Sequence, residues 1–345
     1  MRILSVGSLL GVSNTCVQRT NAMKNLGHKV DEVNTTAPYS FIDHVINRLF
    51  RYHIPVYHRD KTEANKKIID LVNKNNYDIV WIDKGLTIYP TTLKYIRRKL
   101  PNIKIVNYSP DTMSLRHNQS QQYLESIPFY DILFTTKSFI LDDMRKLGAK
   151  NIQFVNNAYE STFHYPRILS TKEKKELGDD VGFVGYWEKK RCKSILYLVD
   201  NGIHVKVFGD FKWNKYRNYS SNLTIIPHLL KGEDYAKSFQ AFKISLCFLR
   251  KMNKDYQTTR TMEIPACGGF MLAERTHEHL SLFDEGKEAD FFDDDEELLR
   301  KCIYYLQHED KRKAIAAAGL QRCINSGYSN INNINHMLSI VQSLN

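Results

Sequence analysis

Residues 258–274, TTRTMEIPACGGFMLAE, carry Arg260, Glu263 and Glu274 within a mostly apolar run that breaks at two glycines. The part before the glycines predicts a short helix, and FMLA after them predicts a strand. A further strand, ISLCFL at 244–249, precedes the helix, with a polar loop between them. Arg260 and Glu263 are therefore expected near a helix start beyond the carboxyl end of one strand, and Glu274 at the carboxyl end of the next.

The same alternation of apolar strands and helices runs through both halves of the chain. In the first half the predicted strands are RILSVG, DIVWID, IKIVNYS, DILFTT and IQFVNN, and in the second they are VGFVG, HVKVFG, LTIIPH, ISLCFL and GFMLAE. Near-continuous apolar strands separated by helices are typical of parallel sheets covered on both faces. The pattern restarts near residue 180. We therefore predict an α/β protein with two doubly wound, Rossmann-like domains, 1–160 and 179–327, joined by a polar linker, 161–178, and facing a central cleft.

Length and composition fit this division. The chain has 345 residues, which is more than one hydrophobic core usually serves. Six scattered cysteines have no zinc-site or redox spacing, which favours buried thiols in a reducing cytosol. The opening MRILSVGSLLG predicts a strand rather than a signal peptide, and no stretch is long and apolar enough to cross a membrane.

The net charge of +11 is placed unevenly along the chain. Residues 1–165 hold 22 Lys and Arg against 14 Asp and Glu, so this part alone carries +8. Such a surface favours an acidic partner, namely anionic lipid, a polyanionic polymer or nucleic acid, although a solvated lysine-rich surface is the alternative.

The helix start at Thr259 and Arg260 has the chemistry of a phosphate site. A helix N-terminus offers free N–H groups and a positive dipole end, and an arginine beside it adds a forked donor. Glu263, one turn further in, is placed to accept hydrogen bonds from ribose hydroxyls. This predicts a nucleotide-diphosphate site that needs no metal. A capped helix with a surface arginine and a locally paired glutamate remains the alternative.

The run from Thr258 to Leu298 resembles the signature of the bacterial CgeB-like (spore-maturation) glycosyltransferases. These are two-domain GT-B enzymes related to the group 1 glycosyltransferases. Five further stretches are similar and follow in family order: DIVWIDKG, YDILFTTKS, NAYESTFHYP, VGFVGYWEKKR and ISLCFLRKMNKD. The resemblance covers most of the chain and is specific for the fold and superfamily, but not for a sugar or an acceptor.

The resemblance implies an N-terminal acceptor domain, a C-terminal nucleotide-sugar domain, and a final helix, 328–345, that packs back on the first domain. Related enzymes often carry two glutamates eight positions apart. Glu263 matches the second, whereas Asp255 replaces the first, which leaves its sugar-side role open. The predicted donor-binding residues are Gly185, Arg191, His228, Asp255, Thr259, Arg260, Glu263, Gly268 and Gly269. Gly185 would let the backbone approach the phosphates, or would merely serve a tight turn.

In the first domain, polar residues follow three predicted strands. Lys84, Asp111 and Lys137 are expected to bind the acceptor, together with His164 at the hinge. Asp111 is the candidate general base, and with Glu263 it forms the predicted catalytic pair. For each of these residues a solvated loop charge is the alternative.

Three other segments are rich in charged or histidine residues. DDDEEL at 293–298 directly precedes a helix, so its acids are interpreted as helix caps rather than metal ligands. HEH at 277–279 has too few partners for a metal site. The basic and aromatic segment 46–59 could rest on an anionic membrane, line an acceptor groove, or form a helix packed on the sheet.

Together these features predict a cytoplasmic enzyme that moves a sugar from a nucleotide diphosphate to an acceptor hydroxyl. A peripheral position on the inner face of the membrane is a further expectation. UDP-sugars are favoured, with no cofactor, no metal, an anionic or carbohydrate acceptor, and retention over inversion. The resemblance implies a role in glycan, cell-surface polysaccharide or spore-coat biosynthesis. The alternatives are a DNA-modifying glycosyltransferase or other nucleic-acid-associated protein, a sugar-nucleotide epimerase, and a non-catalytic relative.

Overall fold

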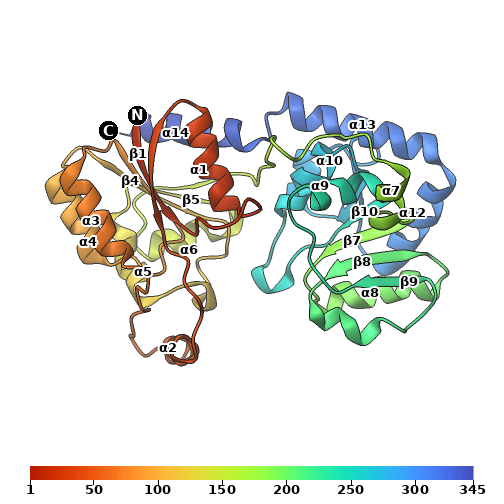
Figure 1. Ribbon diagram of the computed structural model, residues 1–345, viewed down its shortest axis with the longest axis horizontal. Coiled ribbons are helices and arrows are strands. Elements are labelled where there is room, and N and C mark those ends of the chain that lie inside the picture. Colours follow the sequence, from red (N-terminus) through yellow and green to blue (C-terminus); the bar gives the residue numbers. More distant parts are fainter. Residues whose placement is uncertain (345) are drawn as a thin grey trace. The chain divides into compact units, whose positions relative to one another are not determined.

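The computed structural model describes residues 1–344, which form two α/β units (Figure 1). Unit 1 contains residues 1–156 together with the chain from 330 onward, and unit 2 contains residues 157–329. Each unit is built on a six-stranded sheet in which all strands are parallel. The predicted fold class is therefore confirmed.

The sheet of unit 1 has the order β2-β1-β3-β4-β5-β6. Its strands are β1 (Arg2–Gly7), β2 (Lys29–Asn34), β3 (Ile79–Asp83), β4 (Lys104–Ser109), β5 (Ile132–Thr135) and β6 (Ile152–Phe154). The chain leaves β1 toward β2 on one side and returns to β3 on the other. The strand order therefore reverses between β1 and β3, and such a reversal opens a crevice at the carboxyl ends of the two strands.

The helices of unit 1 cover both faces of this sheet. They are α1 (Thr15–Asn25), α2 (Phe41–Arg51), α3 (Ala64–Lys74), α4 (Pro90–Lys99), α5 (Gln121–Ser126), α6 (Leu141–Lys146) and α14 (Asn330–Ser343), with short 3-10 turns η1 (Arg116–Asn118), η2 (Ile127–Phe129) and η3 (Ser138–Ile140). Helix α14 packs against α1, and its Ile334, Met337 and Leu338 complete the core around the fully buried Trp81. The C-terminal helix thus returns to unit 1, as the resemblance implied.

The sheet of unit 2 has the order β12-β11-β10-β7-β8-β9, with the reversal between β7 and β10. Its strands are β7 (Val181–Gly185), β8 (Val205–Gly209), β9 (Leu223–Ile226), β10 (Ile244–Cys247), β11 (Met271–Glu274) and β12 (Asp290–Phe292). Its helices are α7 (Thr171–Leu177), α8 (Lys189–Asp200), α9 (Gly232–Ala241), α10 (Thr259–Ala266), α11 (His277–Leu282), α12 (Asp295–Gln307) and α13 (Glu309–Asn325), with 3-10 turns η4 (Phe211–Tyr216) and η5 (Lys251–Asn253). Apolar side chains fill both faces of the sheet.

Two strands escaped the sequence prediction. β2 alternates charged and apolar residues, and of its six side chains only Val33 is buried, because it lies at the sheet edge. β12 has three residues and lies at the edge of the other sheet. Edge strands need no continuous apolar run. The other two edge strands, β6 and β9, were predicted from the apolar runs in IQFVNN and LTIIPH, whereas β2 alternates and β12 is very short.

The segment 161–178 is not a free linker, because it belongs to unit 2. Ser170 caps α7 in a capping box with Glu173, and Glu173 pairs with Lys237 of α9 at 3.0 Å. The lysine-rich composition of α7 hid a helix whose Leu177 is buried against the domain. Asn345, the last residue of the predicted final helix, lies outside the described residues.

All six cysteines are buried and unbridged, in agreement with the predicted thiols. Within residues 1–344, every helix is too short or too polar to cross a membrane.

Candidate active site

In unit 2 the crevice at the strand-order reversal is formed by the carboxyl ends of β7 and β10. The chain passes from β7 through a short loop into α8, and from β10 through residues 248–258 into α10. Both helices therefore begin at the edge of the sheet where parallel α/β proteins bind their ligands. The candidate site of unit 2 is built from these two loops and helix starts.

Arg191 and Arg260 lie in the first turns of α8 and α10 and share one aromatic ring. Their guanidinium carbons are 5.8 and 6.0 Å from the centroid of the Phe183 ring. Arg191 is 4% exposed, yet its Nε and Nη2 have no hydrogen-bond partner among the described residues, and neither does Nε of Arg260. Burial, and then the positive charge of Arg260, lower the pKa of Arg191 to about 10. Two repelling cations with unused donors form a site for an anion.

The surroundings of this pair are also cationic. Lys190, Arg250 and Lys251 lie at the same edge, where Glu274 pairs with both lysines and Glu188 lies beside Arg250. Glu188 lies 3.6 Å from both Arg191 and Arg250. Glu188 is the N-cap residue of α8, but its side chain accepts no hydrogen bond from the first N–H groups of this twelve-residue helix. The five cations of this region, Lys190, Arg191, Arg250, Lys251 and Arg260, outnumber its four acids, Glu188, Asp255, Glu263 and Glu274, which suits a negatively charged ligand.

Glu274 holds this edge together. The Leu249 N–H donates to its Oε2 at 2.7 Å, and Lys190 and Lys251 each lie 3.0 Å from its Oε1. Burial raises the pKa of Glu274, but this N–H and the lysines outweigh it and leave the pKa below its usual value. Glu274 is therefore charged and ties the loop after β10 to β11. Its position at the ligand edge agrees with the prediction. A carboxylate is needed there because it binds the Leu249 N–H and two lysines.

Glu263 lies in α10, one turn beyond Arg260, and is 4% exposed. The Tyr235 hydroxyl donates to its Oε2 at 2.6 Å, and Nε2 of His164 lies 3.9 Å from its Oε1. Because Nδ1 of His164 accepts the Glu160 N–H at 3.0 Å, the neutral ring carries its proton on Nε2, facing Glu263. Burial lowers the pKa of His164, against the opposing effect of Glu263.

His164 is thus a residue of unit 2 that packs beside Glu263. It belongs to unit 2, whereas Lys84, Asp111 and Lys137 belong to unit 1. Its role in acceptor binding stays a prediction, and the contact that the structure gives it within unit 2 is the Glu263 carboxylate.

Gly185, Thr259 and Asp255 lie near the arginine pair. Gly185 ends β7, and a Cβ added there would come within 2.7 Å of the Phe183 ring, so glycine leaves room for the ring that both arginines contact. Thr259 is the first residue of α10. Asp255 lies in the loop before α10, where its Oδ1 accepts from Asn253 at 3.0 Å.

Three predicted donor residues lie elsewhere. His228 follows β9, at the edge of the sheet two strands away from the reversal, and is exposed. Gly268 and Gly269 end α10 and precede β11, so they lie at the amino ends of the strands. Gly268 has φ +75°, and a Cβ on Gly269 would come within 2.5 Å of the Phe239 carbonyl oxygen. These glycines stop the helix and allow close packing, and their contact with the donor stays a prediction.

In unit 1, Lys84 and Asp111 form an ion pair at the crevice between β1 and β3. They line a cavity of about 430 Å³. Lys84 has φ +57°, an uncommon conformation for a residue with a side chain that recurs at functional sites. Lys137 follows β5, is 3% exposed, and does not line this cavity. The structure therefore joins two of the three predicted acceptor residues of this unit.

The floor of this cavity contains a buried ion pair that the sequence analysis missed. Arg19 of α1 pairs with Asp83 at the end of β3, and their side chains are 7% and 5% exposed. The Arg19 guanidinium lies 4.0 Å from the Tyr108 ring centroid, and Trp81 Nε1 donates to Asp83 at 3.0 Å. The signal was present, since Asp83 is the single charge ending the apolar strand IVWID.

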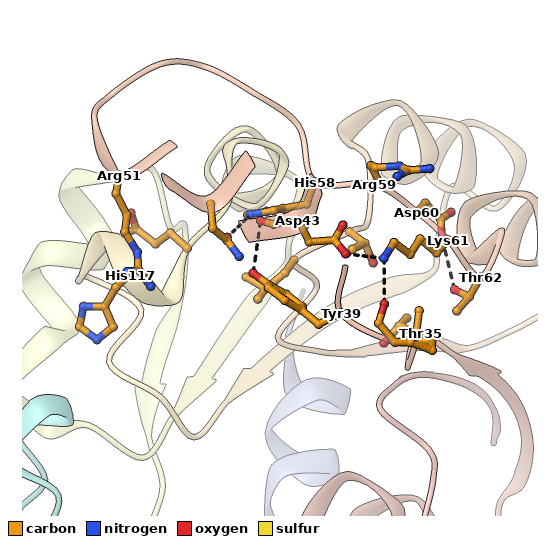
Figure 2. Close-up of a pocket in the computed structure, with 16 residues that line it drawn as sticks. Thr35, Tyr39, Asp43, Arg51, His58, Arg59, Asp60, Lys61, Thr62 and His117 are labelled. Atoms are coloured by element: carbon orange, nitrogen blue, oxygen red, sulfur yellow. Dashed lines mark hydrogen bonds and ion pairs between the residues drawn. The ribbon is translucent and has the colours of Figure 1, made fainter. Parts of the chain in front are cut away.

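A second cavity of about 340 Å³ adjoins the first, with which it shares Thr35, Leu86 and Thr87 (Figure 2). Its lining is rich in cationic and imidazole side chains: Arg51, His58, Arg59, Lys61 and His117. Unit 1 therefore presents two neighbouring polar cavities, and the second had no specific sequence prediction beyond the basic segment 46–59.

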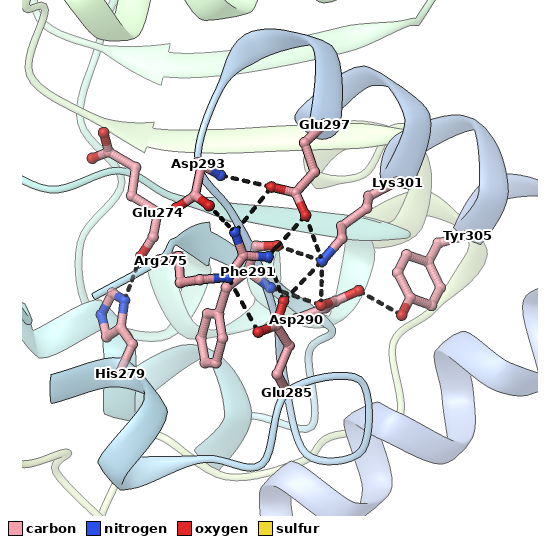
Figure 3. A network of polar contacts seen from close by, with 10 residues as sticks. All are labelled: Glu274, Arg275, His279, Glu285, Asp290, Phe291, Asp293, Glu297, Lys301 and Tyr305. Carbon is pink, nitrogen blue, oxygen red and sulfur yellow. Dashed lines mark hydrogen bonds and ion pairs between the residues drawn. The ribbon is translucent and has the colours of Figure 1, made fainter. Parts of the chain in front are cut away.

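The acidic stretch 293–298 caps α12 as predicted. Asp294 accepts from the Glu297 N–H at 2.8 Å, and Arg275 donates two hydrogen bonds to Glu297, at 2.8 and 3.0 Å (Figure 3). The hydrogen bonds from Arg275 lower the pKa of Glu297 to about 2. Lys301 lowers it further, whereas burial acts in the opposite direction. These acids are engaged in a network that joins β11, β12 and α12.

Comparison with known proteins agrees with this description. Residues 191–339 match the model of a family described as glycosyl transferase-like, and this range contains both Arg191 and Arg260. No curated protein sequence matches the chain.

Solved structures of the same fold cover nearly the whole chain. A glycosyltransferase from Rickettsia africae is 14% identical over 99% of this chain and 98% of its own, with a TM-score of 0.69. HepE of Anabaena in complex with UDP-glucose is 13% identical over 100% of both chains, with a TM-score of 0.66. A putative UDP-N-acetylglucosamine 2-epimerase from Listeria monocytogenes is 12% identical over 99% and 96%, with a TM-score of 0.60. The chain has the GT-B fold that such proteins share.

Proposed function

We propose that this protein is a GT-B glycosyltransferase that moves a sugar from a UDP-sugar to an acceptor hydroxyl. The observation that carries the proposal is the pair of arginines over Phe183, with unused donors, at the strand-order reversal of unit 2. The glycosyl transferase-like match to residues 191–339 and the UDP-glucose bound by HepE support it. The same two findings support membership of the group 1 glycosyltransferases, and the CgeB-like subfamily stays a prediction.

The departing nucleoside diphosphate gains negative charge as the sugar leaves. Arg191, Arg260 and the N-termini of α8 and α10 would stabilise this charge where it develops, which is the largest single contribution in many enzymes. Lys190 and Lys251 keep the edge positive although Glu274 lies between them. These cations supply counter-charge of the kind that a metal ion supplies in other transferases, so we propose metal-independent transfer.

Glu263 would accept hydrogen bonds from the ribose hydroxyls. The contacts with Tyr235 and His164 fix the carboxylate at a set place in α10, which favours recognition of one ribose orientation. Asp255 keeps the eight-residue spacing and is the candidate for the sugar side.

Asp111 would activate or orient the acceptor hydroxyl in unit 1. It pairs with Lys84 at a cavity that the Arg19–Asp83 pair also lines, and the acceptor is proposed to be a carbohydrate or to bear an anionic group that competes with these acids for the two cations. Retention stays the prediction from the paired acids, whereas Asp111 as the base would give inversion. The anomeric proton of the product distinguishes the two outcomes. The resemblance extends the proposal to glycan and cell-surface polysaccharide biosynthesis.

The test is calorimetric binding of UDP, GDP, ADP and TDP to the full chain, with and without magnesium. We expect UDP to bind without magnesium, and Arg191→Gln to weaken it at least tenfold. Arg217→Gln, a change at an exposed arginine of the same unit, is the control. If none of the four nucleotides binds, the chain is a non-catalytic relative.

An epimerase is the second candidate, because the Listeria protein shares the fold. An epimerase would bind UDP-sugar and convert it with no acceptor present. Incubation with UDP-N-acetylglucosamine and analysis of the recovered sugar nucleotide separates the two reactions. A DNA-modifying enzyme would instead require DNA as the acceptor, and salt-dependent DNA binding would reveal it.

A further inference from the structure

Helix α2 turns an apolar surface toward solvent. Phe41, Ile42 and Val45 lie on one side of the helix and are 81, 52 and 40% exposed, and Tyr52, directly after it, is 68% exposed. The buried side chains of α2 are Asp43 and Phe50. The apolar stripe of this helix is therefore only partly used for packing on unit 1, and its remainder faces outward.

The exposed stripe is bordered by positive charge. His44, Arg48 and Arg51 lie on the adjacent side of α2, and the Arg48 guanidinium lies 6.0 Å from the Tyr52 ring centroid. We call Phe41, Ile42, Val45, Arg48, Arg51 and Tyr52 the α2 face. Ser40 caps the helix, so the face is presented on a formed helix rather than on a loop.

The acids of this region are engaged inside the unit. Between residues 39 and 62 the chain has two carboxylates, Asp43 and Asp60. Asp43 accepts from the Ser40 N–H and hydroxyl at 2.7 Å and pairs with Lys61. Asp60 accepts the N–H groups of Ala64 and Asn65 at 2.9 Å. The outer surface therefore keeps the uncompensated charge of its arginines.

The other side of α2 borders the 340 Å³ cavity of Figure 2. Asp43, Asn47 and Arg51, spaced one turn apart, form one wall of it, and Arg59 and His117 are further lining residues. A cationic cavity beside an exposed apolar stripe matches the order of groups at a bilayer surface, where acyl chains adjoin phosphate headgroups.

We propose that unit 1 docks on an anionic lipid bilayer through the α2 face. Phe41, Ile42 and Val45 would enter the boundary between acyl chains and headgroups, and Arg48 and Arg51 would contact lipid phosphates. A nucleic-acid partner would leave the apolar stripe unused, and therefore charge and apolarity together favour lipid. The proposal is independent of the donor site, because vesicle binding needs no nucleotide.

The experiment is flotation of the full chain with vesicles of phosphatidylcholine, with and without phosphatidylglycerol. The apolar test variant is Phe41→Ser with Ile42→Ser and Val45→Ser. Its matched control is Phe211→Ser with Ile168→Ser and Ile324→Ser, three exposed apolar side chains of unit 2. We expect binding to phosphatidylglycerol vesicles to fall more than tenfold in the test variant and to be unchanged in the control.

Charge is tested separately with Arg48→Gln and Arg51→Gln. Each change should weaken binding to phosphatidylglycerol vesicles about fivefold, because an arginine near an anionic surface contributes on that scale. Far-UV circular dichroism and the urea unfolding midpoint of every variant report that the fold is intact. Failure of the wild type to float with phosphatidylglycerol vesicles, or equal flotation of wild type and apolar variant, overturns the proposal. A dimer abolished by the apolar variant, without vesicle binding, would overturn it in favour of contact between two copies.

Discussion

Arg191 and Arg260 begin different helices, yet their guanidinium groups lie within 5.8 and 6.0 Å of the centroid of one phenylalanine ring. The arrangement depends on Gly185, since a side chain there would collide with the Phe183 ring on which both arginines rest. The charge of Arg260 lowers the pKa of Arg191, so the two cations repel each other, and a bound anion would offset this repulsion. Ligand affinity and the stability of the free protein should therefore change in opposite directions when one arginine is removed.

Arg191→Met should stabilise the free protein by about 1 kcal/mol, because it removes a buried, incompletely paired cation and keeps apolar volume. The same variant should bind UDP at least tenfold more weakly. Urea unfolding without ligand and calorimetry with UDP measure the two effects. Arg191→Lys keeps the positive charge but loses the two parallel N–H donors of the guanidinium group, so it should recover part of the affinity for UDP. A variant that loses stability and keeps UDP affinity would contradict the anion site.

Glu263→Ala should raise the Kd for UDP roughly tenfold or more, because hydrogen bonds between ribose hydroxyls and a carboxylate contribute about 1.5–3 kcal/mol. Tyr235→Phe should have a smaller effect, since it removes the hydrogen bond that fixes the Glu263 carboxylate but keeps the carboxylate itself. Calorimetry with UDP and with inorganic pyrophosphate, which has no ribose, checks the assignment. Glu296→Ala on the exposed start of α12 is the control. Equal losses for UDP and pyrophosphate would exclude ribose recognition.

Asp111→Asn should lower the rate of sugar transfer by about 10²–10⁴ and leave UDP binding unchanged, as expected for a general base. The variant also breaks the ion pair with Lys84, so Lys84→Met is needed to separate loss of the base from loss of the pair. Asp142→Asn, at an exposed acid of α6, is the matched control. An Asp111→Asn enzyme with the rate of the wild type would remove this residue from the mechanism.

The sequence identified every inner strand of both sheets, the edge strands β6 and β9, and the positions at which these strands end. That was enough to predict that Arg260, Glu263 and Glu274 lie near one edge, because parallel strands place their carboxyl ends together. Arg191 could be placed at the start of a helix but not over Phe183, since that contact depends on the packing of two loops. Gly268 and Gly269 were assigned to the donor through their proximity in sequence to Arg260, although the length of α10 carries them to the opposite sheet edge.

Contacts between side chains that are distant in the sequence could not be predicted, because no local sequence pattern indicates them. The pairing of Arg19 with Asp83, and the Tyr235 and His164 contacts of Glu263, join residues far apart in the chain. The exposure of α2 was equally hidden, because an amphipathic pattern indicates an apolar side but not whether the protein covers it.

His279 provides a pH dependence of stability with a defined sign. The ring is fully buried, Nδ1 lies 2.7 Å from the Glu274 carbonyl oxygen, and Nε2 lies 2.9 Å from the Thr261 hydroxyl. Because a carbonyl can only accept, Nδ1 carries the proton and Nε2 accepts from Thr261. Burial lowers the pKa of His279 to about 4, against the opposing effect of Glu274. The neutral ring thus links the capped start of α10 to the end of β11.

The folded state binds fewer protons at this ring than the unfolded state between pH 6.5 and pH 4, so the free energy of unfolding falls as the pH falls through that range. The contribution of His279 should amount to about 2 kcal/mol between pH 7 and pH 5. We expect His279→Gln to be less stable than the wild type at pH 7, since its packing is poorer, and to lose less stability on acidification. Urea unfolding of both proteins at pH 7 and pH 5 gives the difference between their slopes, in which the contribution of His164 and the other titrating groups cancels. Identical slopes would mean that His279 binds protons equally in the folded and the unfolded protein, which would contradict a pKa lowered by burial.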